Sequence, residues 1–258
     1  MKITYMSDLH LELDANVDPG TGDVLVLAGD ILVAKNLVSL TDYAKHRKDY
    51  KSFYEKTKKN FKKIYYIHGN HEPYGMDIDI AKEYTSNHLP LWDTTQDAIE
   101  LDDKHVLIQR TLWTDMNKRN RSDMSDLSRE MNDFQIIWKD GHIFKPWDAV
   151  DIFDKHLKDI EDTATKYKDK TIVVVTHHSP SPLGFNKDHQ EDVLTCGYGS
   201  DLGDFIKEHS NIRYWIHGHT HIQKTYDVHQ CKVLSNARGY KGYEDQAETF
   251  GPKVLELP

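Results

Sequence analysis

Short apolar runs along the chain each end in a cluster of polar residues. Segments 2–6, 24–28 and 64–67 are short runs of apolar and β-branched residues, which predicts buried strands, and the same holds for 171–176 and 213–216. Five polar clusters follow these strands directly: Asp8-Leu9-His10, Gly29-Asp30, Gly69-Asn70-His71-Glu72, His177-His178 and Gly218-His219-Thr220-His221. The pattern therefore delivers carboxylates and histidines to the ends of strands.

Helical patterns separate the predicted strands. The predicted helices cover residues 37–59, which are rich in lysine, and residues 78–87, 148–167 and 202–209. Further strands are expected over residues 98–101, 106–109, 224–228, 231–234 and 254–256, the first two forming a hairpin around Asp102-Asp103. Strands that alternate with helices and then give way to a strand-rich end indicate a layered α/β domain.

Regular periodicity fades between residues 112 and 147. This stretch carries Trp113, Trp138 and Trp147 among polar residues, and we predict that it is a cap-like insertion folded over one face of the core. A long surface excursion would give the same pattern. The 258 residues together suit one large domain, so a single domain over residues 1–258 is expected.

The charge of the chain bears on its partners. A formal net charge of −9 argues against a protein that holds nucleic acid through a broad basic face, so stable nucleic-acid binding is not expected. Bound divalent ions reverse the sign of the field locally, so an acidic protein can still attract a phosphate to one pocket.

The amino-terminal sequence and the cysteines bear on location. Polar residues begin at Ser7-Asp8, which leaves no room for the apolar stretch of a signal peptide, and no run of about 18 apolar residues occurs. We therefore predict a cytoplasmic protein without a membrane partner. Cys196 and Cys231 form no short-range pair and are expected to be reduced structural thiols.

The five clusters hold the donors of a metal site. In α/β sheets ligands bind beyond the carboxyl ends of the strands, so clusters far apart in sequence can converge there. Nitrogen and oxygen donors of intermediate hardness suit Mn²⁺, Fe or Zn²⁺, and no thiolate selects a softer metal. We expect Mn²⁺, with Fe, Zn²⁺ or Mg²⁺ as alternatives. Seven ligands with one shared carboxylate would give each of two divalent ions four protein ligands, leaving positions for water and a phosphate oxygen.

In their order along the chain, the clusters resemble the signature motifs of the calcineurin-like metallophosphoesterases. The resemblance spans Asp8 to His221, and the stretches 7–12 and 235–240 are similar to small bacterial and phage members. It implies a four-layer α/β/β/α sandwich. It also implies that one ion is held by Asp8, His10 and His221, that the other is held by Asn70, His177 and His219, and that Asp30 bridges the two. His71 would face the substrate without binding metal.

This arrangement predicts a reaction. Two ions about 3.5 to 4 Å apart can acidify a bridging water and stabilise the charge that develops on the phosphoryl group, so no protein nucleophile is needed. A protonated His71 can give its proton to the departing alkoxide. The expected activity is hydrolysis of a small or nucleotide-type phosphoester, as a phosphodiesterase or a phosphomonoesterase.

Three residues after the last cluster are candidates for binding the substrate. Arg238 is the first, because a guanidinium fork matches phosphate geometry, although a structural salt bridge is the alternative. Asn236 and Tyr240 share the same loop. Residues 29–35 lack the Asp-Arg-Gly continuation of the phosphoprotein phosphatases, so the substrate class of those enzymes does not carry over.

Two alternatives stay open. A nuclease acting on single-stranded ends or short oligonucleotides would use the same site, although the negative charge weighs against it. A non-catalytic metal-binding scaffold would keep the fold and use its surface for partners. Such relatives are expected to have lost ligands or the proton donor, and this sequence has lost none of them.

Overall fold

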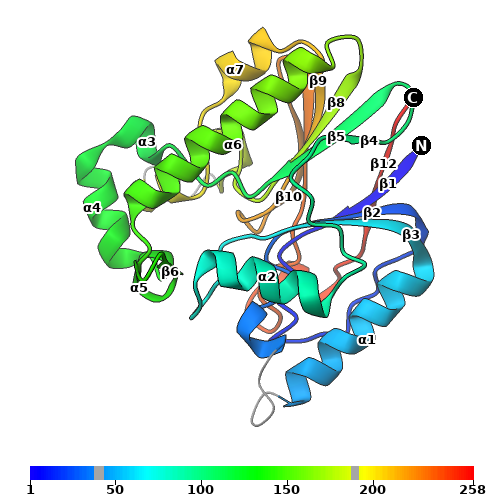
Figure 1. The fold of residues 1–258 in the computed structure, drawn as a ribbon, viewed down its shortest axis with the longest axis vertical. Coiled ribbons are helices and arrows are strands. Elements are labelled where there is room, and N and C mark those ends of the chain that lie inside the picture. Colours follow the sequence, from blue (N-terminus) through cyan, green and yellow to red (C-terminus); the bar gives the residue numbers. More distant parts are fainter. Residues whose placement is uncertain (38–43, 187–191) are drawn as a thin grey trace.

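Two β-sheets pack face to face between two layers of helices in the computed structural model (Figure 1). The structure describes residues 1–37, 44–186 and 192–258, and for residues 44–49 it describes the backbone alone. The first sheet has the order β12-β1-β2-β3, with β1, β2 and β3 parallel and β12 antiparallel to β1. Its strands are β1 (Lys2–Met6), β2 (Gly22–Ala28), β3 (Phe61–Ile67) and β12 (Lys253–Glu256).

The second sheet is larger and has the order β10-β11-β9-β8-β5-β4. Its four central strands are parallel, and β10 and β4 pair antiparallel at its two edges. Its strands are β4 (Ile99–Glu100), β5 (His105–Arg110), β8 (Thr171–Thr176), β9 (Ile212–His217), β10 (Gln223–Val228) and β11 (Cys231–Asn236).

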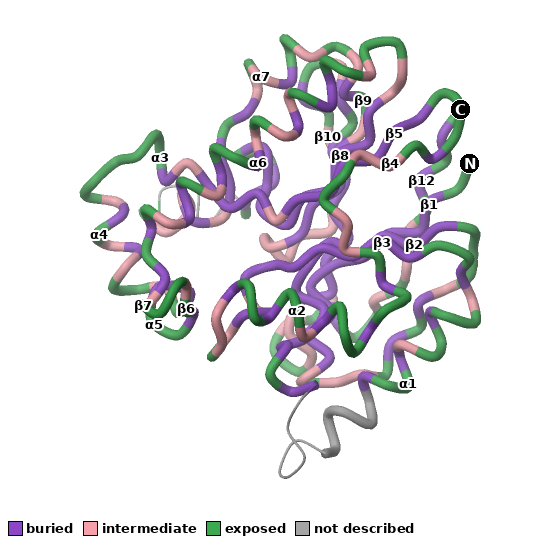
Figure 2. The backbone as a smooth tube through the Cα atoms, in the orientation of Figure 1, coloured by how far each residue is buried: buried purple, intermediate pink, exposed green. Residues whose placement is uncertain are grey.

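Alternation along each strand explains the layers. In β2, Val24 and Val26 face the second sheet, whereas Leu25 and Leu27 face α1 (Ala44–Asn60) on the outside. The outer face of the second sheet is covered by α6 (Pro146–Lys166) and α7 (Gly203–Glu208). Figure 2 shows the sheets as the buried centre of the molecule. The predicted α/β sandwich is therefore confirmed.

Residues 112–147 form more regular structure than their pattern predicts. They contain α4 (Arg121–Glu130), the single turns α3 (Met116–Arg119) and α5 (Asp133–Ile136), and the short hairpin β6 (Trp138–Lys139) and β7 (His142–Ile143). The sequence pattern misses α4 because only Met124 and Leu127 of that helix are buried. Trp113, Phe134 and Phe144 form the centre of a separate hydrophobic cluster in this segment.

Most predicted boundaries agree with the structure within two residues. Of the helix predicted over 37–59, residues 44–59 lie in α1 and Leu37 ends the 3-10 helix η1 (Ala34–Leu37). Residues 38–43 lie outside the described residues. The helix expected over 78–87 is α2 (Ile78–His88), which lies beside segment 112–147. In the described ranges, no helix has the length and apolar character needed to cross a membrane.

Candidate metal centre

The fold brings the five polar clusters to one place. Asp8 and Asp30 follow the parallel strands β1 and β2, and their backbones are tied together because Asp8 N–H donates to the Gly29 carbonyl at 3.0 Å. The second sheet contributes from β8 and β9, where Gly218 N–H donates to the His177 carbonyl at 3.0 Å. Parallel strands present their carboxyl ends at one edge, which explains the convergence.

The backbone of this site is unusual. Five candidate ligands have positive φ angles between 45° and 66°: Asp8, His10, Asp30, His219 and His221. Non-glycine residues seldom adopt this conformation, and such strain persists only where the surrounding structure over-determines it. The surrounding structure therefore holds these loops in an unfavourable backbone conformation, which places the five side chains at the site.

Asp8, His10 and His221 form the first group of possible ligands. The Nε2 atoms of His10 and His221 lie 3.2 Å apart, and the latter lies 3.5 Å from Asp8 Oδ1. Glu12 and Glu244 accept from the Nδ1 atoms of these two imidazoles, at 3.2 Å and 2.6 Å. With its proton on Nδ1, each ring presents a lone pair at Nε2. Two facing lone pairs beside a carboxylate fit a shared cation.

Asp30, Asn70, His177 and His219 form the second group. His177 donates from Nδ1 to the Ala28 carbonyl at 2.9 Å, and its Nε2 lies 3.0 Å from Asn70 Oδ1 and 3.3 Å from Asp30 Oδ2. The Nε2 of His219 is buried and has no hydrogen-bond partner among the described residues. A buried nitrogen without a partner is costly unless something absent from the protein satisfies it, so this donor set also fits a divalent cation.

The charges of Asp30 and His177 depend on each other. Burial alone would raise the pKa of Asp30, but the adjacent His177, together with His71 and His10, holds that pKa well below its usual range. Burial would likewise lower the pKa of His177, yet Asp30 raises it to about 10. The buried carboxylate therefore demands a nearby positive charge, which a bound cation can supply in place of the imidazolium proton.

The chain around Asp30 is closely packed, with no space for a side chain at Gly29. A Cβ on Gly29, whose φ is +85°, would lie 2.4 Å from His177 Nδ1. The buried Glu72 accepts from the backbone N–H groups of Asp30, Ile31 and Gly69 at 3.1, 2.8 and 2.7 Å. Glu72 thus joins the loop after β2 to the loop after β3.

The two groups of candidate ligands together form a cage of donor atoms, and His71 lies at its edge. Its backbone N–H donates to Asp30 Oδ1 at 2.8 Å, and its Nε2 is 3.9 Å from Asp30 Oδ2 and 3.3 Å from the Tyr240 hydroxyl. Its ring stacks on Tyr74 at 4.1 Å between centroids. Burial lowers the pKa of His71, with Asp30 opposing that shift. His71 is close enough to His10 and Asp30 to be a ligand on distance alone.

The three substrate-binding candidates differ in position. Tyr240 lies in the cavity wall. Arg238 is only 3% exposed, and its guanidinium donates to the Leu9 and Asp14 carbonyls and to the Asp14 carboxylate. Asn236 is also buried and donates to the Tyr5 and Gly251 carbonyls. The structure does not bring Arg238 and Asn236 to the cavity, because their polar groups hold the main chain together.

Each histidine next to a candidate ligand has at least one ring nitrogen near a protein group, and the Nε2 of His178 is buried without a partner among the described residues. His68 pairs with Thr85 Oγ1 at 2.7 Å, His217 with the Tyr226 hydroxyl at 3.2 Å, and His178 Nδ1 lies 3.3 Å from the Thr111 carbonyl. Burial lowers the pKa of His68 and His178 to about 3 and that of His217 to about 4. These residues are neutral supports of the loops.

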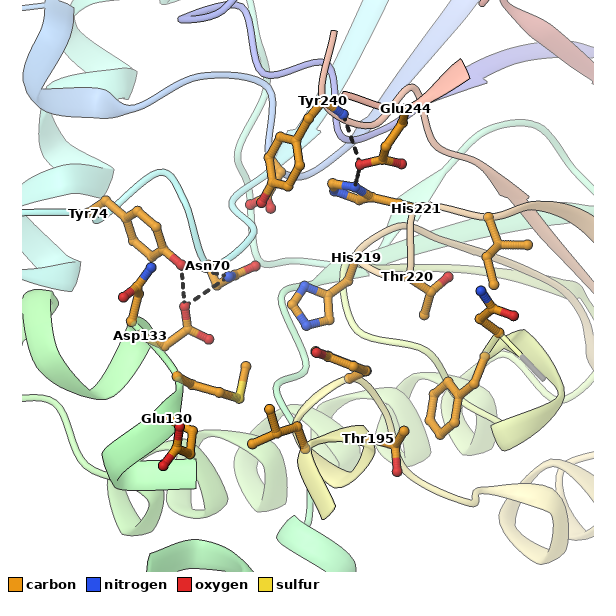
Figure 3. A pocket seen from close by; sticks show the side chains of 18 residues that line it. Asn70, Tyr74, Glu130, Asp133, Thr195, His219, Thr220, His221, Tyr240 and Glu244 are labelled. Carbon is orange, nitrogen blue, oxygen red and sulfur yellow. Dashed lines mark hydrogen bonds and ion pairs between the residues drawn. The ribbon is translucent and has the colours of Figure 1, made fainter. Parts of the chain in front are cut away.

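The cage opens into a cavity of about 570 Å³, shown from close by in Figure 3. Asn70, His219 and His221 line one side. The other side comes from segment 112–147 and from residues around η4 (Val193–Gly197). Sequence reasoning missed two carboxylates here, Asp133 and Glu244, which accept hydrogen bonds from Asn70 and His221. No motif marks either residue, since each reaches the site only through tertiary packing.

Comparison with known proteins identifies the family of this arrangement. The family model for calcineurin-like phosphoesterases matches residues 1–223. The chain belongs to the calcineurin-like phosphoesterase family. As a member it is a hydrolase that acts on phosphoesters with divalent metal ions, and its clustered histidines and aspartates could bind them.

One known protein is similar in sequence, and two solved structures have a similar fold. An uncharacterized protein of Acanthamoeba polyphaga mimivirus is 24% identical to this phosphoesterase, over 92% of this chain and 91% of that protein. The phosphopantetheinyl hydrolase of Mycobacterium tuberculosis has a similar fold, with a TM-score of 0.67 and 14% identity over 100% of this chain and 96% of that one. A dimetal phosphatase from Danio rerio gives 0.54 and 11% identity over 100% and 92%.

Proposed function

We propose that this phosphoesterase hydrolyses a small phosphoester at a site for two divalent ions. One ion would be held by Asp8, His10 and His221, the other by Asn70, His177 and His219, with Asp30 shared between them. The observation that carries the proposal is the convergence of Nε2 atoms on one another or on a carboxylate oxygen within 3.5 Å, together with the buried, partnerless Nε2 of His219 among the described residues. Mn²⁺ is the proposed metal, since nitrogen and oxygen donors of intermediate hardness suit it.

The chain's own residues then have defined tasks. Bound ions would supply Lewis-acid activation of a water and of the phosphoryl oxygens. His71 is proposed to donate the proton that the leaving alkoxide needs, from Nε2, where Tyr240 also lies. Tyr240 keeps its proton, because burial raises the pKa of its hydroxyl. Its hydroxyl can therefore orient the imidazole or donate to a phosphate oxygen.

The cavity favours a small organic group on the substrate. Its volume of about 570 Å³ is in the usual range for small-molecule sites. Apolar and aromatic side chains, among them Phe185, Leu194 and Tyr198, form part of its wall, and Glu130 adds a carboxylate. No lysine or arginine is among its lining residues within the described ranges. We propose that the substrate's organic part is uncharged or cationic, with the phosphate as its only anionic group.

A His71→Ala variant tests the proton donor. We expect the rate on alkyl phosphoesters to fall by about 10² to 10⁴, and the rate on p-nitrophenyl esters to fall much less, because nitrophenolate leaves without a proton. The metal content should stay at two ions per chain. His88→Ala, at an exposed histidine of α2, is the control and should change neither property. Loss of an ion from His71→Ala would instead make His71 a ligand.

A substrate panel tests the reaction class. The metal-free protein would be loaded with Mn²⁺ and assayed on nucleotides, cyclic nucleotides, short oligonucleotides and a phosphopantetheinyl diester. The last compound is included because of the Mycobacterium tuberculosis neighbour. We expect turnover of small monoesters or diesters and little of oligonucleotides. Faster turnover of oligonucleotides would favour the nuclease alternative, and no turnover with two ions bound would favour a scaffold.

A further inference from the structure

One carboxylate connects segment 112–147 to the candidate metal centre. Asp133, the first residue of α5, is only 1% exposed. Its Oδ1 accepts from Asn70 Nδ2 at 2.9 Å and from the Tyr74 hydroxyl at 2.6 Å (Figure 3). Both partners belong to the loop after β3, and Asp133 contacts them from a part of the chain about sixty residues away.

The contact with Asn70 selects one orientation of its amide. An amide can be turned by 180° with almost no change in shape, which exchanges its oxygen and its NH₂ group. A carboxylate accepts hydrogen bonds and does not donate them, so Asp133 accommodates only the NH₂ group. Asn70 Oδ1 is thereby turned toward His177 Nε2, at 3.0 Å. The oxygen is the only amide atom with a lone pair to give to a metal ion.

The contact with Tyr74 links Asp133 to His71, the proposed proton donor. The Tyr74 ring stacks on the His71 ring, with an interplanar angle of 26°. Its hydroxyl is held by Asp133 and also lies 3.3 Å from Asn70 Nδ2. One carboxylate thus restrains a candidate ligand and the ring that packs against His71.

The second oxygen of Asp133 is a cost to the stability of this arrangement. Oδ2 is buried and has no hydrogen-bond partner in the part of the chain that the structure describes. Burial raises the pKa of Asp133, and the hydrogen bonds from Tyr74 and Asn70 oppose that shift. A buried oxygen without a partner destabilises a fold. Asp133 also lies in the wall of the cavity.

We propose that Asp133 is a positioning residue that acts through Asn70, and that segment 112–147 thereby completes the metal centre as well as lining the cavity. This inference rests on the proposed function, because it assumes that Asn70 binds an ion. The ion held by Asn70, His177 and His219 depends on Asp133, whereas the ion held by Asp8, His10 and His221 does not.

Metal titration of the apoprotein tests this directly. In Asp133→Ala, calorimetry should show that the Mn²⁺ affinity of one site falls by about 10- to 100-fold and that the affinity of the other site is unchanged. A loss of this size is usual when a residue that hydrogen-bonds to a metal ligand is removed. Asp133→Asn can still present an oxygen to both donors and should stay within a few-fold of wild type. Asp126→Ala is the control, since Asp126 lies in the same segment but pairs with the surface residue Arg129.

A double-mutant cycle separates positioning from general stability. Asn70→Ala should weaken the same site, and adding Asp133→Ala to it should cause no further loss, because Asp133 acts through Asn70. Should Asp133→Ala fail to fold, Asp133→Ser replaces it, because the shorter hydroxyl cannot reach both donors. Thermal unfolding without metal shows which variants are folded.

Three results would overturn the inference: wild-type affinity at both sites in Asp133→Ala, equal weakening of both sites, or losses that add in the double variant. Failure of the proposed function looks different. It would appear in the wild-type protein as fewer than two bound ions or as no hydrolysis of any phosphoester. If wild type binds two ions and turns over substrate, only the role of Asp133 is in question.

Discussion

Replacing Arg238 tests whether this residue stabilises the fold or binds the substrate. Its guanidinium is buried, donates to the Leu9 carbonyl at 3.0 Å and to the Asp14 carbonyl at 2.6 Å, and forms an ion pair with the Asp14 carboxylate. These contacts join the loop after β1 to the loop after β11. We therefore expect Arg238→Ala to lower stability and to leave substrate affinity almost unchanged.

The size of the loss follows from these contacts. Breaking a buried ion pair by removing one partner costs about 3–5 kcal/mol. The Asp14 side chain is 31% exposed, so water can solvate it after the mutation, which reduces the estimate. The loss of hydrogen bonds to two main-chain carbonyls acts in the opposite direction. We expect a decrease of about 2–4 kcal/mol in the free energy of unfolding.

The dependence on pH gives a second check. Burial raises the pKa of Asp14, but hydrogen bonds from the Asn16 N–H and from Arg238 outweigh it, so the pKa is lowered in the folded protein. A carboxylate with a lowered pKa stabilises the fold above its unfolded pKa of about 3.9, and that contribution is lost as the pH falls through the folded value. The difference between wild type and Arg238→Ala should be constant near neutral pH and shrink below about pH 4.

Urea denaturation and steady-state kinetics on the same samples distinguish a stabilising Arg238 from a substrate-binding one. Arg238→Met keeps the aliphatic packing and should lose nearly as much stability as Arg238→Ala, and Arg238→Lys should lose less because it keeps the charge. The Michaelis constant should stay within about twofold in all three variants, since Arg238 is not among the residues that line the cavity. Unchanged stability together with a tenfold higher Michaelis constant would refute this reasoning and restore Arg238 as a phosphate ligand.

Three further predictions concern the cage. Glu244→Gln removes the carboxylate behind His221, which should weaken metal binding by about 10- to 100-fold in calorimetry; an unchanged affinity would show that Glu244 does not orient the ring. Gly29→Ala adds a Cβ 2.4 Å from His177 Nδ1 at a φ of +85°. It should lower the free energy of unfolding by more than backbone strain does by itself, which is about 1–3 kcal/mol. Gly141→Ala, at a φ of +80° with open space around it, measures that strain by itself, and equal losses in the two variants would contradict the clash. Chelation should abolish hydrolysis and Mn²⁺ should restore it, whereas full activity after exhaustive dialysis against chelator would contradict a metal requirement.

The order of strands and polar clusters was readable from the sequence. Apolar runs of strand length predict β1, β2, β3, β8 and β9, because each of these strands is buried on both faces. The residues just after them are the candidate ligands, because the chain leaves a parallel strand at the edge where a site forms. Histidines and carboxylates at such positions are local features, which the sequence can show.

The partners of those residues were decided only by tertiary structure. Glu244 lies 23 residues after His221, and Asp133 lies 63 residues after Asn70, so no spacing rule connects them. Both come from loops or short turns whose path depends on what they pack against. The left-handed backbone of His10 and of four other candidate ligands is likewise imposed by the fold.

Arg238 illustrates the same division. The sequence shows an arginine in a loop near the site, and a guanidinium suits a phosphate as well as a carboxylate or a carbonyl. Only the packing of the loops after β1 and β11 decides between them, by burying Arg238 against Asp14 and Leu9. The sequence by itself therefore determined which donors reach the site, because strand ends are local. Tertiary structure decided which side chains orient them and which lie elsewhere, because those contacts join distant parts of the chain.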